Sequence, residues 1–200
     1  MSARILKDFD FLAGVHFSDK YYVNAYDIEA SFMVESPSIA DQNTALERVK
    51  YFLYDCLEHS VFIHENDTEA IDKYLNAGME VCTLPEEPYD QIIAIMLLVK
   101  INAITEGKLI LTDISLASKM SDGVQCLHSM EENIGPFLNK GWFNEPSTRK
   151  TDYDPKSKNK KIVKLSKIKN EWTELDLEYE KNQSKSDADI LFATFEKTDK

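Results

Sequence analysis

The sequence predicts an α+β domain over residues 1–145, followed by a charged tail over 146–200. Three observations carry this prediction. Early segments rich in aromatic and β-branched residues are typical of strands, and later stretches repeat apolar residues every three or four positions, as helices do. Beyond Trp142 the regular apolar pattern stops. With 43% hydrophobic content, 200 residues are enough to bury one core.

The first two predicted strands form a hairpin. Phe9, Phe11 and Ala13 occupy alternate positions of the first strand, and residues 22–34 make a longer second strand. The polar cluster at 18–20 provides the connection between them.

Helical spacing then replaces alternation. Apolar residues recur at three and four positions over 43–57, with Thr44 and Glu47 as a capping box at the start. A second, shorter helix is predicted over 67–77 and ended by Gly78.

The second half of the domain continues the mixed pattern. A strand is predicted over 79–84, a long buried helix over 89–106 and a strand over 109–117. A turn at Asp122-Gly123 leads into a final strand over 124–128.

Charge and cysteine usage exclude several classes of protein. Residues 149–200 carry 13 basic and 11 acidic side chains and the rest carry 10 and 24, so the body is acidic and nucleic-acid binding is not expected. Cys56, Cys82 and Cys126 are odd in number and form no CxxC, which favours a reducing, cytoplasmic compartment. The longest apolar run, 92–99, is far below the ~20 residues of a membrane span.

The tail has blocks of opposite charge. Residues 156–169 are rich in lysine, and residues 171–180 are acidic. Such blocks are typical of mobile, solvated arms, which is the prediction here; the alternative is an arm that docks on its own or a neighbouring subunit.

Four short stretches resemble the tunnelling-fold family of 6-pyruvoyltetrahydropterin and 6-carboxytetrahydropterin synthases. Residues 7–13 resemble its first strand, Leu57-Glu58-His59 its Leu-Asp-His, residues 84–91 its Pro-Thr-x-Glu helix start and residues 109–113 its last strand. The resemblance implies an antiparallel sheet with helices on one face.

The family's metal site is only partly represented. Its three zinc histidines correspond to His16 and to Asn24-Ala25-Tyr26, and no cysteine precedes Cys56 to act as its general base. Zinc is the cofactor that the resemblance implies, but its usual ligands are largely missing, so no metal ligand set is predicted.

The other family roles correspond to residues that this chain does contain. The resemblance implies that Asp113 anchors a pterin ring and that His59 and Glu58 form the catalytic proton-transfer pair, with Gln91 and His16 as further substrate-binding residues. On strict alternation, Asp113 shares a face with Leu109 and Leu111.

Each assignment has a structural alternative. His59 at a helix end can favour the helix dipole, Gln91 can cap the following helix and His16 can be a satisfied loop histidine. Asp113 can pair at an interface instead of lining a pocket. His64 and His128 have no partner at a metal-ligand spacing and are predicted to be surface residues.

Two functions follow from these patterns. The first is a pterin- or purine-type heterocycle-binding protein, which as an enzyme would be a tetrahydropterin synthase-like lyase. The second is a non-catalytic oligomeric binding or scaffold protein of the same fold. Both are expected to be homo-oligomers, because open sheets leave edges that neighbours cover. A polar cleft around Asp113 favours the first, and a filled apolar one the second.

Overall fold

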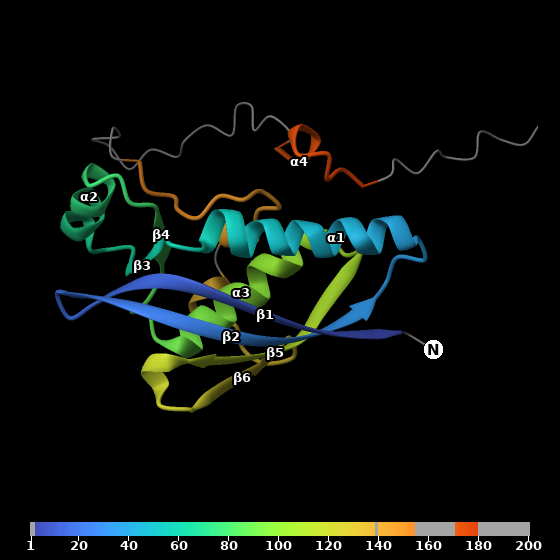
Figure 1. The fold of residues 1–200 in the computed structure, drawn as a ribbon, viewed down its shortest axis with the longest axis horizontal. Helices are drawn as coiled ribbons and strands as arrows, with labels where there is room; N and C mark the ends of the chain where they lie inside the picture. The colour runs from blue at the N-terminus through green and yellow to red at the C-terminus, as the bar shows by residue number, and fades with distance from the viewer. Residues whose placement is uncertain (1–2, 139, 155–170, 180–200) are drawn as a thin grey trace, which may run out of the picture.

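The computed structural model describes residues 3–138, 140–154 and 171–179 and confirms the α+β prediction. Six strands form one sheet in the order β4-β3-β1-β2-β5-β6 (Figure 1). The strands are β1 (Arg4–Phe17), β2 (Lys20–Val34), β3 (Val61–His64), β4 (Val81–Leu84), β5 (Leu109–Ser118) and β6 (Gln125–Ser129). The helices are α1 (Ile39–Tyr51), the π-helical η1 (Phe52–Leu57), α2 (Thr68–Asn76), α3 (Asp90–Thr105) and α4 (Glu171–Glu174).

The sheet is mixed. β1, β2, β5 and β6 are antiparallel neighbours, whereas β3 runs parallel to β1 and β4 parallel to β3. Ser18 and Asp19, both with positive φ, make the tight loop between β1 and β2. This loop places Phe17 opposite Lys20, which fixes the register of the whole hairpin.

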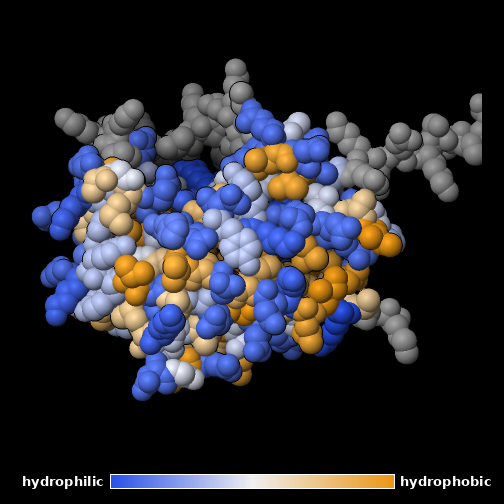
Figure 2. Space-filling model, viewed as in Figure 1, coloured by the Kyte–Doolittle hydropathy of each residue, from blue (hydrophilic) through white to orange (hydrophobic). Residues whose placement is uncertain are grey.

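The main core lies between the sheet and the helices α1, η1 and α3. Phe9 and Phe11 of β1 and Tyr26 of β2 point into it, and α3 is buried over residues 92–101. The prediction of a buried helix is therefore confirmed. None of the helices in the described part is long and apolar enough to cross a membrane. Figure 2 shows hydrophilic side chains over most of the surface in the view of Figure 1, with hydrophobic ones scattered among them.

α2 lies on the opposite face of the sheet from the other helices. Phe62 of β3 points into the main core, while its neighbours Val61 and Ile63 pack with Ile71 and Tyr74 of α2. β3 is thus covered on both faces, as is usual for parallel strands. The outward faces of β1, β2, β5 and β6 carry exposed side chains, and we call this surface the open face.

α1 begins earlier than the sequence predicts. The hydroxyl of Ser38 accepts a hydrogen bond from the Asp41 backbone N–H at 3.2 Å and caps the helix. The predicted capping box of Thr44 and Glu47 is therefore wrong, because both residues lie inside α1. Most positions in the first turn of α1 are not buried, so the apolar spacing that predicts the helix begins only after that turn.

The packed domain extends beyond residue 145. The backbone carbonyl of Lys150 accepts a hydrogen bond from Thr83 N at 3.0 Å, along the outer edge of β4. Trp172 is 3% exposed, and α4 lies over α1 in Figure 1. Residues 146–154 and 171–179, predicted as mobile tail, therefore belong to the packed structure. The lysine-rich block, 156–169, lies outside the described residues, as do residues 180–200, whereas nearly all of the acidic block lies in the described 171–179.

Candidate ligand site on the open face

A β-bulge decides where Asp113 points. The β2–β5 register pairs Phe32 with Leu111 and Ser31 with Asp113, so that Thr112 is an extra residue without an opposite partner. The Thr112 hydroxyl donates to the Ser31 carbonyl at 3.0 Å and holds the irregularity in place. A bulge reverses the alternation beyond it. Asp113 therefore lies exposed on the open face, and the prediction that it shares a face with Leu111 is wrong.

Asp113 lines a pocket of about 410 Å³ on this face. The pocket lies over β1, β2, β5 and β6, and the carboxylates of Asp8 and Glu29 line it together with Asp113. One lysine, three serines, four apolar residues and a histidine–glutamate pair complete the walls: Lys7, Ser31, Ser115, Ser129, Leu6, Ala30, Ile114, Leu127, His128 and Glu132. The volume falls within the ~300–1,000 Å³ range of small-molecule sites.

The pocket is strongly anionic. Asp8 lies directly opposite Glu29, and the next pair on this face is Asp10 opposite Asp27. Within the described residues, none of these four carboxylates nor Asp113 makes a side-chain hydrogen bond or ion pair. Like charges directly opposite each other destabilise a strand pair. The sheet thus retains an electrostatic cost at this position, which is a common property of binding sites.

Glu29→Gln is therefore expected to stabilise the protein. Removing one charge of the Asp8–Glu29 pair should raise the free energy of unfolding by roughly 0.5 kcal/mol at low ionic strength, and by less in ~1 M salt, because salt screens exposed charges. Denaturant unfolding at both ionic strengths measures this. Glu86→Gln, at an exposed position before α3, is the matched control and should change little. Destabilisation by Glu29→Gln at low salt would contradict the repulsion.

The predicted catalytic pair lies outside this pocket. His59 follows η1 with a φ of 64°, and its backbone N–H donates to the Leu12 carbonyl at 2.8 Å. Glu58 precedes it, and Gln91 is exposed in the first turn of α3. Of the predicted site residues, only Asp113 is among those that line the pocket, so a single chain does not bring the set together.

The implied zinc site does not fit this chain. The Asn24 side chain is buried and accepts a hydrogen bond from Met120 N at 3.1 Å, and the ring of Tyr26 stacks on Phe11 in the core. Neither residue can replace a zinc-binding imidazole there. Burial also raises the pKa of the Cys56 thiol to about 11, so it stays protonated at neutral pH and is a poor general base.

His128 is buried, contrary to the prediction of a surface residue. It is 7% exposed, and its Nδ1 lies 3.0 Å from a carboxylate oxygen of Glu132. The reason is alternation on β6: Leu127 faces outward with 73% exposure, so its neighbour turns inward. His128, Asp8 and Glu29 are among the pocket residues that sequence reasoning did not assign to a site. The hairpin register was the available signal for the last two.

Comparisons with known proteins give little further information. No family model matches the chain, and no curated protein matches it either. Among solved structures, the chain is similar to an uncharacterized protein from Wolinella succinogenes, with 13% sequence identity and a TM-score of 0.48. That likeness covers 66% of this chain and 99% of the other.

Proposed function

We propose that this protein binds a small planar heterocycle of the pterin or purine type in the pocket of the open face, with Asp113 as the anchoring acid. The observation that carries the proposal is the bulge at Thr112, which presents the Asp113 carboxylate in a ligand-sized pocket without a partner in the described structure. The resemblance noted in the sequence assigns the same role to this residue.

The chemistry of the pocket suits a donor-rich ligand. A carboxylate can accept two parallel hydrogen bonds from the amino group and the adjacent ring N–H of an amino-pyrimidine edge. Glu29 and Asp8 add acceptors beside it, and serine hydroxyls can satisfy the remaining polar atoms of a ring. Leu6 and Leu127 offer apolar contact to its faces. Donors from the ligand would also offset the repulsion between the carboxylates.

Asp113→Asn tests the anchor. The change keeps the size of the side chain but replaces a charged acceptor by an amide, so the dissociation constant for pterin should rise about 10- to 100-fold. Titration followed by the fluorescence of pterin itself measures the constant. Guanine, which has the same amino and ring N–H edge, should compete with pterin, whereas adenine, which lacks that edge, should compete weakly.

Asp27→Asn is the matched control for this test. Asp27 lies on the same face and carries the same charge, but it does not line the pocket. It should leave the dissociation constant within about twofold of the unaltered protein. Equal affinity of the Asp113→Asn variant and the unaltered protein for pterin would show that Asp113 is not the anchor.

A synthase-type lyase reaction is not part of this proposal. It would require the pair of His59 and Glu58 beside the bound ring, and these residues lie outside the pocket of the single chain. The residues of the pocket themselves support binding.

A non-catalytic oligomeric scaffold remains the second candidate, because one observation favours it. Leu6 of β1 is 80% exposed, and Leu127 is 73% exposed on β6, which is an edge strand of the described sheet. A neighbouring copy could cover them. Light scattering over a concentration series, combined with the pterin titration, distinguishes the two functions: a homo-oligomer that dissociates in Leu127→Ser and never binds pterin would favour the scaffold.

A further inference from the structure

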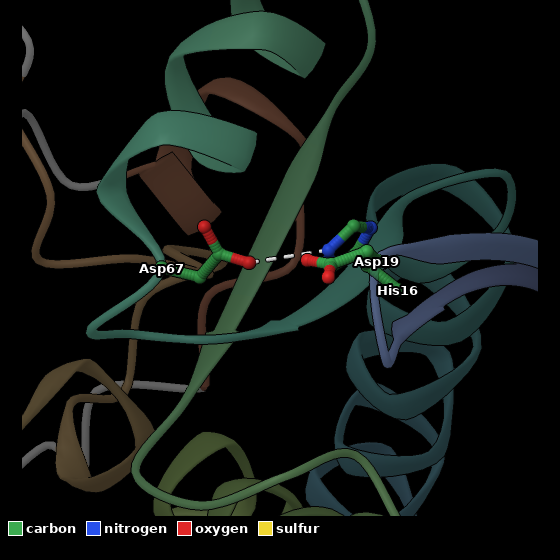
Figure 3. Close-up of side chains that lie close together, drawn as sticks. All are labelled: His16, Asp19 and Asp67. Carbon is green, nitrogen blue, oxygen red and sulfur yellow. Dashed lines mark ion pairs between the residues drawn. The ribbon is translucent and has the colours of Figure 1, made fainter.

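A second cluster of functional groups lies at the far end of the β1–β2 hairpin, separate from the pocket. His16 of β1, Asp19 of the tight loop and Asp67 before α2 converge there (Figure 3). One ligand atom from each of the three residues can be chosen so that all three atoms lie within 4.8 Å of one another. His16 and Asp19 are three positions apart at the end of the hairpin, and the packing of α2 against β3 brings the distant Asp67 to them.

We propose that His16, Asp19 and Asp67 form a binding site for a divalent first-row transition-metal ion. His16 Nε2 and Asp67 Oδ2 are 3.1 Å apart, which is roughly the separation of two adjacent ligands around one such ion. Two carboxylates balance the charge of a divalent cation. One imidazole with two carboxylates suits manganese(II), since oxygen ligands favour it and imidazole is compatible.

The surroundings hold the first two ligands in place. The Tyr74 hydroxyl is hydrogen bonded to His16 Nδ1 at 2.9 Å, which leaves Nε2 directed at Asp67. Asp67 uses Oδ1 to accept from the Ala70 backbone N–H at 3.1 Å as the N-cap of α2, and its Oδ2 faces His16 Nε2, so that a metal ion would replace the proton between these two atoms. Second contacts of this kind fix the tautomer and orientation of metal ligands.

The third ligand and the access to the site also fit. Asp19 is exposed and has a φ of 60°, in the left-handed region that aspartate tolerates better than most residues. The imidazole of His16 is only 11% exposed, whereas Asp67 is 34% exposed. A cation can therefore enter from solvent on the carboxylate side and reach a largely buried nitrogen. Water molecules would complete its coordination shell.

This site differs from the zinc site that the resemblance implies. It uses only one residue at a position where that family has a zinc ligand, and its other two ligands come from the loop and from the start of α2. It also shares no residue with the pocket around Asp113, so it does not rest on the proposed function, and either can fail without the other.

Manganese(II) binding to the chelator-treated full-length protein is the test. The electron paramagnetic resonance signal of free Mn²⁺ should fall on titration with a stoichiometry of one and a dissociation constant in the micromolar range. Saturating Mn²⁺ should also raise the melting temperature by several degrees, because it binds only the folded state. A dissociation constant above about 1 mM, or several equal weak sites, would overturn the proposal.

Two variants locate the site without disturbing the fold. Asp67→Asn retains a side chain that caps helices well, and Asp19→Asn retains one that accepts the left-handed conformation. Each should weaken Mn²⁺ binding at least about 10-fold. Asp10→Asn, an exposed acid on the same strand as His16, is the control and should bind as the unaltered protein does. Unchanged affinity in both cluster variants would mean that the ion binds elsewhere and would overturn the assignment.

Discussion

Replacing Arg48 by alanine is expected to lower the free energy of unfolding by about 3 kcal/mol, since it leaves buried acceptors without a donor. Arg48 is 3% exposed on α1. Its guanidinium donates to the carbonyls of Leu177 at 2.7 Å and Ile104 at 3.2 Å, and to the carboxylate of Glu106 at 2.5 Å. One side chain thus ties α1 to the end of α3 and to the C-terminal segment.

The same guanidinium lies between two aromatic rings. Its central carbon is 4.7 Å from the ring centroid of Trp172 and 3.9 Å from that of Tyr179. Cation–π contacts in a desolvated position can contribute up to ~2 kcal/mol. Loss of Arg48 should therefore release residues 171–179 first, and the fluorescence of Trp172 should shift to the red in a Trp142→Phe background.

Thermal unfolding measures the size of the effect. A loss of about 3 kcal/mol corresponds to a fall in the melting temperature of roughly 6–12 °C for a chain of this size. Arg48→Lys should recover only part of the loss, because an ammonium group cannot reproduce the planar fork. Lys50→Met, on the same helix with an exposed ion pair to Glu47, should change stability by less than about 0.5 kcal/mol. A melting temperature for Arg48→Ala within 2 °C of the unaltered protein would show that the arginine does not hold the segment.

The Arg48 cluster also explains why the tail was predicted only in part. Acidic residues surround Trp172 and Tyr179, and by composition such a stretch is solvated. The segment is anchored by the buried guanidinium of Arg48, which lies 129 positions before Leu177 in the sequence. A contact of that range leaves no local signal in either segment.

The open face was more accessible to sequence reasoning than the bulge. A two-residue loop at Ser18 and Asp19 fixes the hairpin register, and counting back from it places Asp8 opposite Glu29. The acidic pair could have been found in this way. The bulge could not, because an extra residue such as Thr112 follows from the pairing of β2 with β5 and not from the apolar pattern of β5. Strict alternation therefore put Asp113 on the wrong face.

The long helix α3 was predicted well because its apolar pattern lies within one continuous segment. α3 is apolar around its whole circumference, which fits only a helix buried on all sides, and the structure buries it between the sheet, α1 and the 142–145 segment. The basic residue in that helix is Lys100, which is fully buried. Its position leads to the second large prediction.

Lys100 should make stability depend on pH near and above neutrality. Its ammonium donates to the carbonyls of Trp142 at 2.8 Å and Glu145 at 2.9 Å, and it lies 5.2 Å from the ring centroid of Trp142. Burial lowers the pKa of Lys100 from 10.5 to about 8. Between these two values the unfolded chain binds more protons than the folded one, so the contribution of Lys100 to the free energy of unfolding rises as the pH increases.

Comparison with Lys100→Met isolates this contribution from those of other groups. Burial raises the pKa of Cys82 to about 12, which has the opposite effect, but only above pH ~9. The stability of the unaltered protein relative to Lys100→Met should therefore increase by about 1 kcal/mol between pH ~7 and ~9 in denaturant unfolding.

The absolute difference at pH ~7 is less informative than this slope. Two opposed effects determine it: methionine removes a desolvated charge, but it also leaves two buried carbonyls without their donor. Lys50→Met, at an exposed position, should give a difference that does not change over the same range. If the difference in free energy of unfolding between the unaltered protein and Lys100→Met did not change with pH, the amine would titrate as it does in water. The 142–145 segment would then have to open readily enough to hydrate the amine, and Trp142 fluorescence would report that opening.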